Sequence, residues 1–574
     1  MRAPGRVVLE RGIPVPMRDG VVLAADLYRP DDTERHPVLV QRTPYDRTMA
    51  ANAISDIDPV KMALAGYVVV VQDVRGRYDS EGAFVTYDNE ADDGFDTVEW
   101  AARQEWSDGS VGAFGLSYMA QCALLAASRR PPALRAVASL QSPDSTTGGD
   151  RYRGGALALG VLAGWAMQTI VPAEVLRAAR TDPSRYAEIP AVIDDVDGLD
   201  AHMARLPLVP FPPMDDRDVD PAHYFDRTAR YEFHPPVPRF EPQDLAVPAL
   251  VIAGWNDIFL QPNLDLFTAL RAAGSTPEVR RYTRLIVGPW AHGTPTAAVG
   301  QLDYGFRASP LFLDLREDFN RLHQRWFDAR MRGRDSGIDH EAPVRLFVTG
   351  VNRWRDEQEW PLARAAEQAW HLHAGGRLDP GVPSASEPSE YWLDPEDPVP
   401  TWGGGLLMNA SYGRGPVDQR RVEERDDVLL FTSEPVHEAL EVTGRLRLVA
   451  WVTAETPDTD LVARLCDVHP DGRSYNLADG ILRLRFREGL DREVLLEPGV
   501  EYRVEVDMWS VAHVFLPGHR LRLQVRASDF PRYDRCPGDG SLSADSATVL
   551  PQRNRIFHDP SRASHLVLPV IAPA

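Results

Sequence analysis

The sequence predicts an α/β enzyme domain that is divided by a helical insertion and followed by an all-β domain. Strand and helix signals alternate over the first 145 residues, as they do in a sheet with crossover helices. The alternation stops between residues 142 and 242 and resumes near residue 249, so an insertion divides this domain. From about residue 354 onward, short strands with period-two alternation are separated by Gly-, Pro- and Asp-rich turns, which is typical of a sandwich or jelly roll.

The first part of the α/β domain has the signals of one hairpin and several buried strands. The hairpin is expected over residues 15–28, about the Asp19-Gly20 turn. Parallel strands that are buried on both faces need continuous apolar runs, and these occur at residues 37–41 and 67–72. Four further elements complete this part: a helix at 92–103, a strand at 111–114, a helix at 118–128 and a strand at 134–140.

The insertion is expected to be helical. Residues 154–173 carry no charge and are numerous enough to cross a bilayer, but their four glycines and Pro172 favour a buried helix over a pocket. Residues 206–216 are expected to be the least structured. Insertions of this kind leave a sheet at the edge where ligands bind, so they commonly form lids or substrate walls.

The remaining signals set the domain bounds. The α/β domain resumes with a strand at 249–254, a helix at 263–273, a strand at 284–288 and a helical run at 311–331. Strands of the all-β domain are expected at 445–452, 481–486, 502–508 and 520–525. The predicted bounds are 1–144 and 243–353 for the two parts of the α/β domain, 145–242 for the helical cap insertion and 354–574 for the β domain.

Composition limits the partners and the compartment. Sixty-two basic and 84 acidic residues give a net charge of -22, which argues against nucleic acid and anionic membranes and favours a small-molecule substrate. The three cysteines, Cys122, Cys466 and Cys536, are too far apart for a metal motif or a disulfide framework. Residues 1–12 are charged throughout and lack the apolar centre of a signal peptide. We therefore expect a cytoplasmic protein without a metal or cofactor.

Ser117 has the setting of a nucleophile. It lies in Gly115-Leu116-Ser117-Tyr118-Met119-Ala120, where a strand of small and apolar residues runs into a helix. The sharp turn that exposes such a serine needs small residues two positions to either side. Gly115 meets this requirement, whereas Met119 departs from the simplest Gly-x-Ser-x-Gly pattern.

Asp257 and His292 are the candidates for the other two members of a catalytic triad. Asp257 follows the strand at 249–254, and His292 follows the strand at 284–288. Taken alone, each is more simply a turn former. Together with Ser117 they have the Ser, Asp, His order of the α/β-hydrolase arrangement, each residue beyond the end of a strand. His36 precedes a strand and His323 lies within a helix, so neither is expected to act as the base.

The chain resembles the cocaine esterase and X-Pro dipeptidyl-peptidase family of serine hydrolases over nearly its whole length. The matching stretches are Pro16-Met17-Arg18-Asp19-Gly20, Pro44-Tyr45-Asp46, Gln72-Asp73-Val74-Arg75-Gly76, Ser80-Glu81-Gly82, Gly115-Leu116-Ser117-Tyr118, Gly254-Trp255-Asn256-Asp257, Gly288-Pro289-Trp290-Ala291-His292, Leu516-Pro517-Gly518-His519-Arg520 and Phe530-Pro531-Arg532-Tyr533-Asp534. The resemblance implies an α/β-hydrolase domain with an inserted helical cap domain and a C-terminal β jelly-roll domain. It also resolves the difficulty at Met119, because the family pattern is Gly-x-Ser-Tyr-x-Gly; its closing glycine is Ala120 here.

The resemblance implies roles for further residues. The oxyanion hole would consist of the Tyr118 N–H and the Tyr45 phenol, and the acyl pocket would contain Trp165, Phe259, Leu407 and Met408. Met408 replaces an aromatic residue expected from the esterase branch, which makes the pocket more adaptable.

Three charged residues near these motifs are interpreted as binding or structural residues and not as catalytic ones. Asp150 is close to the position where the esterase branch has a second tryptophan, so an acyl group with an amine near Asp150 is a hypothesis. Asp73 and Arg75 are interpreted as structural ion-pair residues that hold the active-site loops.

Several functions remain open at this stage. The leading expectation is hydrolysis of small carboxylic esters through an acyl-enzyme on Ser117, without a cofactor. The alternatives are an Xaa-Pro dipeptidyl peptidase, an amide or α-amino acid ester hydrolase, an acyltransferase with the same triad, and a binding protein with an inactive hydrolase domain. Edge strands of the β domain could pair two copies of the chain, so a homodimer is a further expectation.

Overall fold

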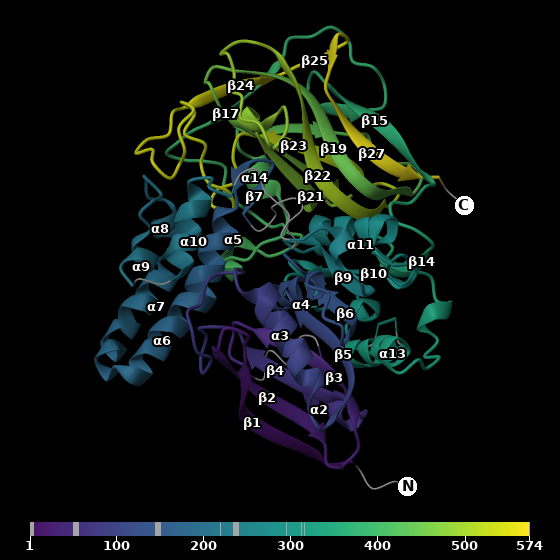
Figure 1. The fold of residues 1–574 in the computed structure, drawn as a ribbon. Helices are drawn as coiled ribbons and strands as arrows, with labels where there is room; N and C mark the ends of the chain where they lie inside the picture. The colour runs from purple at the N-terminus through teal and green to yellow at the C-terminus, as the bar shows by residue number, and fades with distance from the viewer. Residues whose placement is uncertain are drawn as a thin grey trace.

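The fold comes from a computed structural model, which describes residues 5–49, 57–143, 151–217, 220–233, 240–293, 295–311, 313–314 and 316–572. Three parts are visible in Figure 1: the α/β domain with the amino terminus at the bottom, the helices of the insertion at the left and the β domain at the top. The predicted fold class is confirmed.

The α/β domain is built on a ten-stranded sheet, whose strand order is β1-β2-β4-β3-β5-β6-β9-β10-β13-β14. The central pairs from β4 to β13 are parallel, and the pairs β1–β2, β2–β4 and β13–β14 are antiparallel. The strands are β1 Val7–Pro16, β2 Val22–Pro30, β3 His36–Thr43, β4 Val68–Asp73, β5 Ser107–Leu116, β6 Leu134–Leu140, β9 Ala249–Asn256, β10 Arg284–Ala291, β13 Val344–Val348 and β14 Arg353–Glu357.

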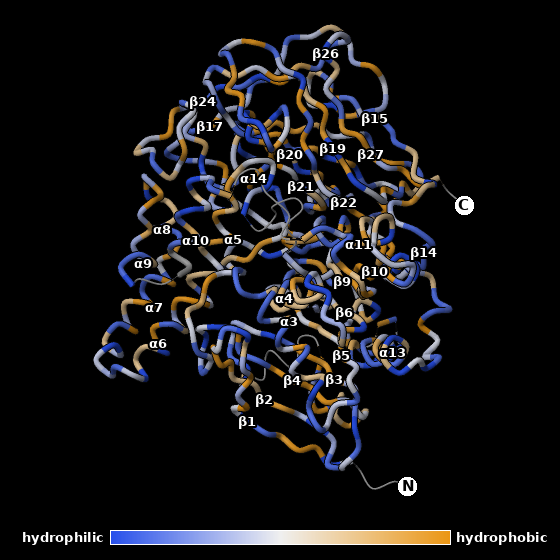
Figure 2. The backbone as a smooth tube through the Cα atoms, viewed as in Figure 1, coloured by the Kyte–Doolittle hydropathy of each residue, from blue (hydrophilic) through white to orange (hydrophobic). Residues whose placement is uncertain are grey.

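Helices cover both faces of this sheet. Every residue of β4, β9 and β10 is buried, which explains why these strands are continuous apolar runs. Adjacent residues of β3 illustrate the two faces, because Val38 and Val40 belong to one apolar core and Leu39 to the other. Apolar segments accordingly run through the strands in Figure 2. The helices are α2 Pro59–Leu64, α3 Glu90–Ala102, α4 Tyr118–Ser128, α11 Leu260–Ala273, α12 Pro277–Tyr282 and α13 Phe319–Met331.

Two boundaries of the α/β domain differ from the expectations. The helical run expected at 311–331 begins only at Phe319, because the Asp318 side chain accepts a hydrogen bond from the Arg321 N–H and caps the helix there. The predicted bound after residue 353 falls at the start of β14, which pairs with β13 in the first sheet.

The insertion connects β6 to β9 and consists mainly of helices. They are α5 Leu159–Trp165, a π-helical turn Ala166–Ile170, α6 Val171–Thr181, a 3₁₀ turn Pro183–Glu188, α7 Ile189–Asp197, α8 Leu199–Met203, α9 Pro212–Asp215 and α10 Asp220–Ala229. The helix expected over 154–173 starts later than predicted. Gly154 and Gly155 instead form the positive-φ turn of a short hairpin, β7 Tyr152–Arg153 and β8 Ala156–Leu157, close to Ile481 and Phe486 of the β domain.

One helical run in the described part of the chain, Leu159–Thr181, is long and apolar enough by composition to cross a membrane. Of its most apolar window, 56% is buried inside the protein. Core helices of soluble proteins meet the same criterion, and Leu162, Met167 and Val175 belong to the apolar core of the insertion.

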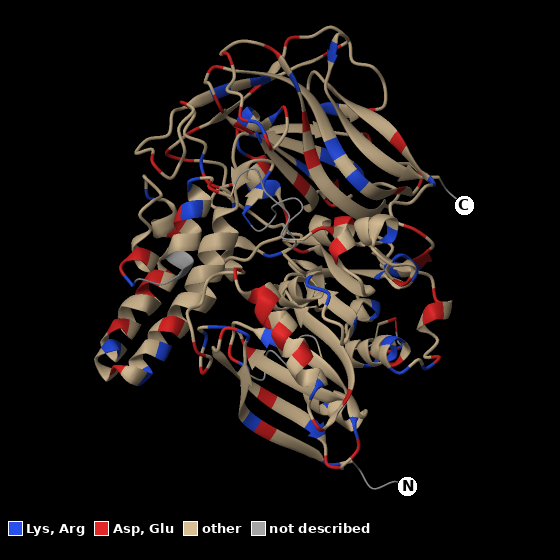
Figure 3. Ribbon diagram, in the orientation of Figure 1, with Lys and Arg blue, Asp and Glu red and all other residues tan. Residues whose placement is uncertain are grey.

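The β domain is a sandwich with its own core, and all its strand pairs except the parallel pair β16–β18 are antiparallel. Its eleven-stranded sheet has the order β17-β24-β19-β27-β15-β16-β18-β23-β20-β21, and β22 pairs with β19 outside this path. The strands are β15 Ala365–His373, β16 Arg377–Asp379, β17 Ser389–Leu393, β18 Leu429–Thr432, β19 Leu440–Ala454, β20 Asp460–Val468, β21 Ser474–Arg483, β22 Tyr502–Phe515, β23 Arg520–Arg526, β24 Gln552–Ile556 and β27 His565–Ile571. The strand expected at 481–486 ends at Arg483, and Leu484–Phe486 forms a 3₁₀ turn. Charges of both signs are spread over all three parts in the view of Figure 3.

Candidate active site

Ser117, Asp257 and His292 meet at the carboxyl ends of neighbouring parallel strands. Ser117 lies between β5 and α4, Asp257 follows β9 and His292 follows β10. In the sheet order, β6 separates β5 from β9, and β9 is adjacent to β10. The residues predicted from three distant segments are therefore brought to one edge of the sheet, where open α/β sheets place their ligands.

The backbone at Ser117 is strained in the way a nucleophile elbow requires. Its φ and ψ are 57° and -124°, a combination that non-glycine residues seldom adopt. A Cβ on Gly115 would lie 2.4 Å from the carbonyl carbon of Met119, so only glycine fits there. The Met119 side chain itself is buried against the sheet, and Ala120 is fully buried. Methionine is thus tolerated because its side chain points into the core.

A continuous hydrogen-bonded chain joins the three residues. His292 Nε2 lies 2.9 Å from Ser117 Oγ, and His292 Nδ1 lies 2.8 Å from Asp257 Oδ2. The other Asp257 oxygen accepts a hydrogen bond of 2.6 Å from the Phe259 N–H. The side chains of Asp257 and His292 are 0% and 5% exposed, so little water competes for these bonds. This arrangement can move a proton from the serine to the imidazole.

Gln141 holds the loop that carries His292, and the sequence analysis missed it. Its Nε2 donates to the Ala291 carbonyl at 3.0 Å, and its Oε1 accepts from the Gly293 N–H at 2.9 Å. Gln141 is fully buried and directly follows β6. A polar residue just past a strand was the signal used for Asp257 and His292, and the same signal identifies Gln141.

Tyr45 and Tyr118 lie beside Ser117. The Trp165 indole N–H donates to the Tyr45 phenol oxygen at 2.9 Å. Burial raises the pKa of Tyr45 far above its usual value, so the phenol keeps its proton at neutral pH. Tyr118 is the first residue of α4, where N–H groups lack partners within the helix.

The Tyr118 side chain is fixed by its neighbours. Its ring stacks between Tyr87 and Trp165, with centroids 4.3 and 6.1 Å away, and its hydroxyl donates to Glu90 at 3.0 Å. These contacts anchor the residue whose backbone N–H lies next to Ser117.

An apolar, aromatic pocket opens at Ser117. Its lining residues are Tyr45, Tyr87, Ser117, Tyr118, Pro143, Val161, Leu162, Trp165, Tyr224, Phe259 and Leu407. Three of the four predicted pocket residues, Trp165, Phe259 and Leu407, are among them. The fourth, Met408, is not: its thioether packs against Gly160 in the core of the insertion. Asp150 lies outside the described residues. Tyr87 and Tyr224 were not predicted, because nothing in their sequence surroundings marks them.

Asp73 and Arg75 both form ion pairs, but not with each other. Asp73 forms an ion pair with the Arg47 guanidinium and also accepts a hydrogen bond of 2.7 Å from the Arg47 backbone N–H. Arg75 forms ion pairs with Asp93 and Asp19 at 2.6 and 2.8 Å. These pairs tie the loops after β3 and β4 to the hairpin and to α3, which supports their structural interpretation.

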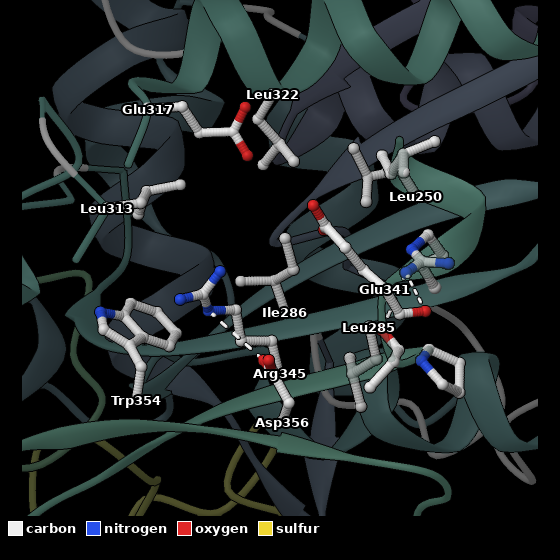
Figure 4. Close-up of a pocket in the computed structure, with 14 residues that line it drawn as sticks. Leu250, Leu285, Ile286, Leu313, Glu317, Leu322, Glu341, Arg345, Trp354 and Asp356 are labelled. Carbon is white, nitrogen blue, oxygen red and sulfur yellow. Dashed lines mark hydrogen bonds and ion pairs between the residues drawn. The ribbon is translucent and has the colours of Figure 1, made fainter. Parts of the chain in front are cut away.

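A second cavity lies at the opposite end of the sheet. It is lined by the first residues of β10 and β13 and by residues around α13, among them Leu285, Leu322, Glu317, Arg345 and Trp354 (Figure 4). Glu317 pairs with Arg325 at 2.6 Å, and Arg345 lies 3.7 Å from Asp356. The charged groups around this cavity have partners of their own, and none of the predicted catalytic residues lines it.

One group in the described part of the chain has the geometry to hold a metal ion. Asp467, His469 and His519 of the β domain offer ligand atoms within 4.8 Å of one another. Asp467 is already bound by His519 Nδ1 at 2.8 Å and by His513 Nε2 at 3.2 Å. A hydrogen-bonded carboxylate therefore accounts for this cluster, which the chemistry at Ser117 does not involve.

Comparisons with known proteins agree with this architecture. The profile of the X-Pro dipeptidyl-peptidase (S15) family matches residues 19–294, and that of the X-Pro dipeptidyl-peptidase C-terminal non-catalytic domain matches residues 336–567. Cocaine esterase of Rhodococcus sp. (strain MB1 Bresler) is 36% identical over 99% of both chains.

Solved structures show the same fold at lower identity. An aminopeptidase from the marine sediment archaeon Thaumarchaeota archaeon is 24% identical, with a TM-score of 0.74 over 99% of this chain and 97% of its own. An α-amino acid ester hydrolase is 23% identical, with a TM-score of 0.75 over the same shares of the two chains.

Proposed function

Because this chain belongs to the cocaine esterase and X-Pro dipeptidyl-peptidase family of serine hydrolases, we propose that it cleaves carboxylic esters through an acyl-enzyme on Ser117. The observation that carries the proposal is the hydrogen-bonded chain from Asp257 through His292 to Ser117 Oγ. The apolar pocket at Ser117 supplies the place for the acyl group.

Acylation follows from the positions of the three side chains. His292 Nε2 takes the proton of Ser117 as Oγ attacks the ester carbonyl, and the imidazolium that forms is stabilised by Asp257. The second hydrogen bond of Asp257, from the Phe259 N–H, fixes the carboxylate. His292 then gives the proton to the departing alcohol, and a water molecule repeats the sequence to release the acid.

The charge that develops on the carbonyl oxygen needs donors. We assign this role to the Tyr118 N–H and the Tyr45 hydroxyl, both of which adjoin the pocket at Ser117. Since the Trp165 N–H donates to the Tyr45 oxygen, the phenol is oriented and polarised before substrate arrives. One such donor is typically worth about 3 kcal/mol of transition-state stabilisation.

The relative that is 36% identical is named an esterase, and this favours ester hydrolysis over peptide cleavage as the proposal. Cleavage of Xaa-Pro amides is the second candidate, because both matching profiles carry the dipeptidyl-peptidase description. Acyl transfer to an amine or alcohol would use the same acyl-enzyme. An amine-bearing acyl group near Asp150 stays a hypothesis.

The test is a panel of activated esters, anilides and Xaa-Pro anilides, with the Ser117→Ala protein as control. We expect turnover of esters by the natural protein, none above background by Ser117→Ala, and labelling of Ser117 by a fluorophosphonate. Equal turnover by the variant, or no labelling, would overturn the proposal. Higher kcat/KM on Xaa-Pro anilides than on esters would favour the second candidate.

Two expectations from the sequence also stand as proposals. We propose a cytoplasmic location and a homodimer formed through edge strands of the β domain. Sedimentation of the purified protein at two concentrations tests the dimer, and a monomer at both would exclude it.

A further inference from the structure

Arg414 lies directly beside the triad, although it belongs to the β domain. Its Nη1 donates to the backbone carbonyl of His292 at 3.3 Å. Glycines flank it on both sides, Gly413 with φ of 69° and Gly415 with φ of 90°. The Gly415 backbone exchanges two hydrogen bonds of 2.8 Å with Gly404, so the turn that presents the guanidinium is pinned to its own domain.

Arg414 forms no ion pair with any of the residues that the structure describes. Among the described residues, no carboxylate lies within 4.0 Å of its guanidinium, whereas Arg153, Arg464 and Arg532 all pair with Asp479 nearby. Arg414 is half-buried, and this burial lowers the pKa of the guanidinium, with the Asp257 carboxylate partly opposing the effect. A half-buried cation that donates to one backbone carbonyl and has no ion pair among the described residues is well suited to bind an anion from solution.

A groove leads away from this cation. One wall comes from the loop around His292, with Ala291, Thr296 and Val299, and the other from the β domain, with Trp402 and Arg414. The groove holds about 580 Å³, enough for a small organic group. Its lining shares no residue with the acyl pocket at Ser117.

The position of the groove decides which part of a substrate could occupy it. The acyl group has its own pocket on the side of Trp165 and Leu407. His292 protonates the leaving group, and the groove begins at the residue before it, Ala291. In the proposed mechanism, the leaving alcohol or amine, or an acceptor that replaces it, is therefore the part of the substrate on the side of this groove and Arg414.

We propose that Arg414 binds a carboxylate on the leaving-group side of the substrate. This rests on the proposed function, and it narrows the substrate class to esters or amides whose alcohol or amine carries a carboxylate. During hydrolysis the ester C–O bond breaks, the departing oxygen takes its proton from His292, and the carboxylate of the leaving group stays with Arg414. A bidentate guanidinium–carboxylate pair gives direction as well as affinity.

The test uses two acetate esters with the same acyl group, 3-acetoxybenzoate and 3-acetoxybenzamide. We expect the natural protein to prefer the carboxylate ester in kcat/KM. Arg414→Gln should reduce the ratio of the two kcat/KM values at least tenfold, and Arg414→Lys should reduce it less. The control is Arg421→Gln, which removes an exposed guanidinium near Trp402 and should keep the ratio. An unchanged ratio in Arg414→Gln would mean that Arg414 only supports the His292 loop, and would overturn the proposal.

A binding measurement separates this proposal from the proposed function. Calorimetry with the Ser117→Ala protein should show 3-hydroxybenzoate binding more tightly than 3-hydroxybenzamide, and the difference should disappear when Arg414→Gln is added. Absence of that difference overturns the carboxylate site even if both esters are hydrolysed. If neither ester is hydrolysed but the difference is found, the site stands and the proposed ester hydrolysis fails.

Discussion

Gln141 fixes the backbone on both sides of His292. Its amide donates to the carbonyl of the residue before the histidine and accepts from the N–H of the residue after it, at 3.0 and 2.9 Å. The Gln141 N–H is itself bound to the Ile252 carbonyl at 2.8 Å, so the end of β10 is tied through β6 to β9. The imidazole therefore takes its position from three strands.

Replacing Gln141 with methionine should lower kcat more than it changes KM. Methionine has a similar volume but lacks the amide donor and acceptor, so the His292 loop would lose both restraints and the Ala291 carbonyl and the Gly293 N–H would lose these partners. A shift of the imidazole by about 1 Å can cost on the order of 100-fold in rate. We expect kcat to fall by about 10- to 100-fold, measured by steady-state kinetics on the best ester of the panel.

The control for this prediction is Gln104→Met. Gln104 lies just past the end of α3 and donates to the Trp100 carbonyl at 2.9 Å; it precedes β5, whose opposite end leads into Ser117. It should leave kcat within about twofold, since surface changes seldom propagate. A kcat for Gln141→Met that matches this control would show that other contacts suffice to hold His292.

Replacing Tyr45 with phenylalanine tests the oxyanion assignment. The ring and its packing stay, but the donor to the developing charge is lost, so kcat should fall by about 100- to 1,000-fold. Trp165→Phe removes the hydrogen bond to the Tyr45 oxygen and leaves the phenol in place. Its smaller loss, on the order of tenfold, would follow from poorer orientation of the phenol. If Tyr45→Phe were no worse than Trp165→Phe, the tyrosine would not be the donor.

The fold could be predicted from local patterns because its strands are either fully buried or regularly alternating. The strand expected at 134–140 has the bounds of β6, and the helix expected at 118–128 has those of α4. The helix expected from residue 311 began at Phe319, because a single capping aspartate outweighed the apolar spacing. The helix expected from residue 154 gave way to a hairpin, because Gly154 and Gly155 contact the distant residues Ile481 and Phe486. Contacts between residues so far apart in the sequence leave no pattern in the local sequence.

The candidate site could be predicted where residues follow strands, and not where they depend on tertiary packing. Ser117, Asp257 and His292 lie past strand ends, and the geometry brings them together. The family resemblance placed Met408 in the pocket, but its side chain packs against Gly160 instead. Arg414 comes to the triad from another domain, so only the assembled structure reveals its position.

Alanine at position 115 should disrupt the elbow. Its Cβ would lie 2.4 Å from the Met119 backbone, which cannot move without shifting the start of α4. We expect loss of nearly all activity and a lower Tm, since strain of this kind typically costs about 1–3 kcal/mol. Ala120→Gly restores the family pattern at the third residue of α4 and should cost at most about 1 kcal/mol of stability. If Gly115→Ala kept its activity, the close approach at this turn would be unnecessary for placing Ser117.

His323 is a buried histidine outside the active site. It lies in α13, is 1% exposed, and contacts the Phe319 carbonyl through Nδ1 at 2.7 Å. Burial lowers the pKa of this imidazole to about 4, although the hydrogen bond to the carbonyl partly opposes the shift. The folded protein therefore keeps His323 neutral under mildly acidic conditions.

This depressed pKa predicts a pH-dependent loss of stability that one substitution should reduce. Well above pH 6.5, His323 is neutral in both the folded and the unfolded chain, so it contributes no pH dependence there. As the pH falls from about 6.5 to 4, His323 binds a proton in the unfolded chain but stays neutral in the folded protein. The free energy of unfolding therefore decreases by up to about 3 kcal/mol. His323→Asn keeps a donor for the Phe319 carbonyl but does not titrate, so its Tm should fall less between pH 7 and pH 4.5 than that of the natural protein. The exposed residue His437, which forms no ion pair with the described residues, supplies the control: His437→Asn should follow the pH profile of the natural protein. Parallel profiles for His323→Asn and the natural protein would mean that the buried imidazole gains its proton without cost.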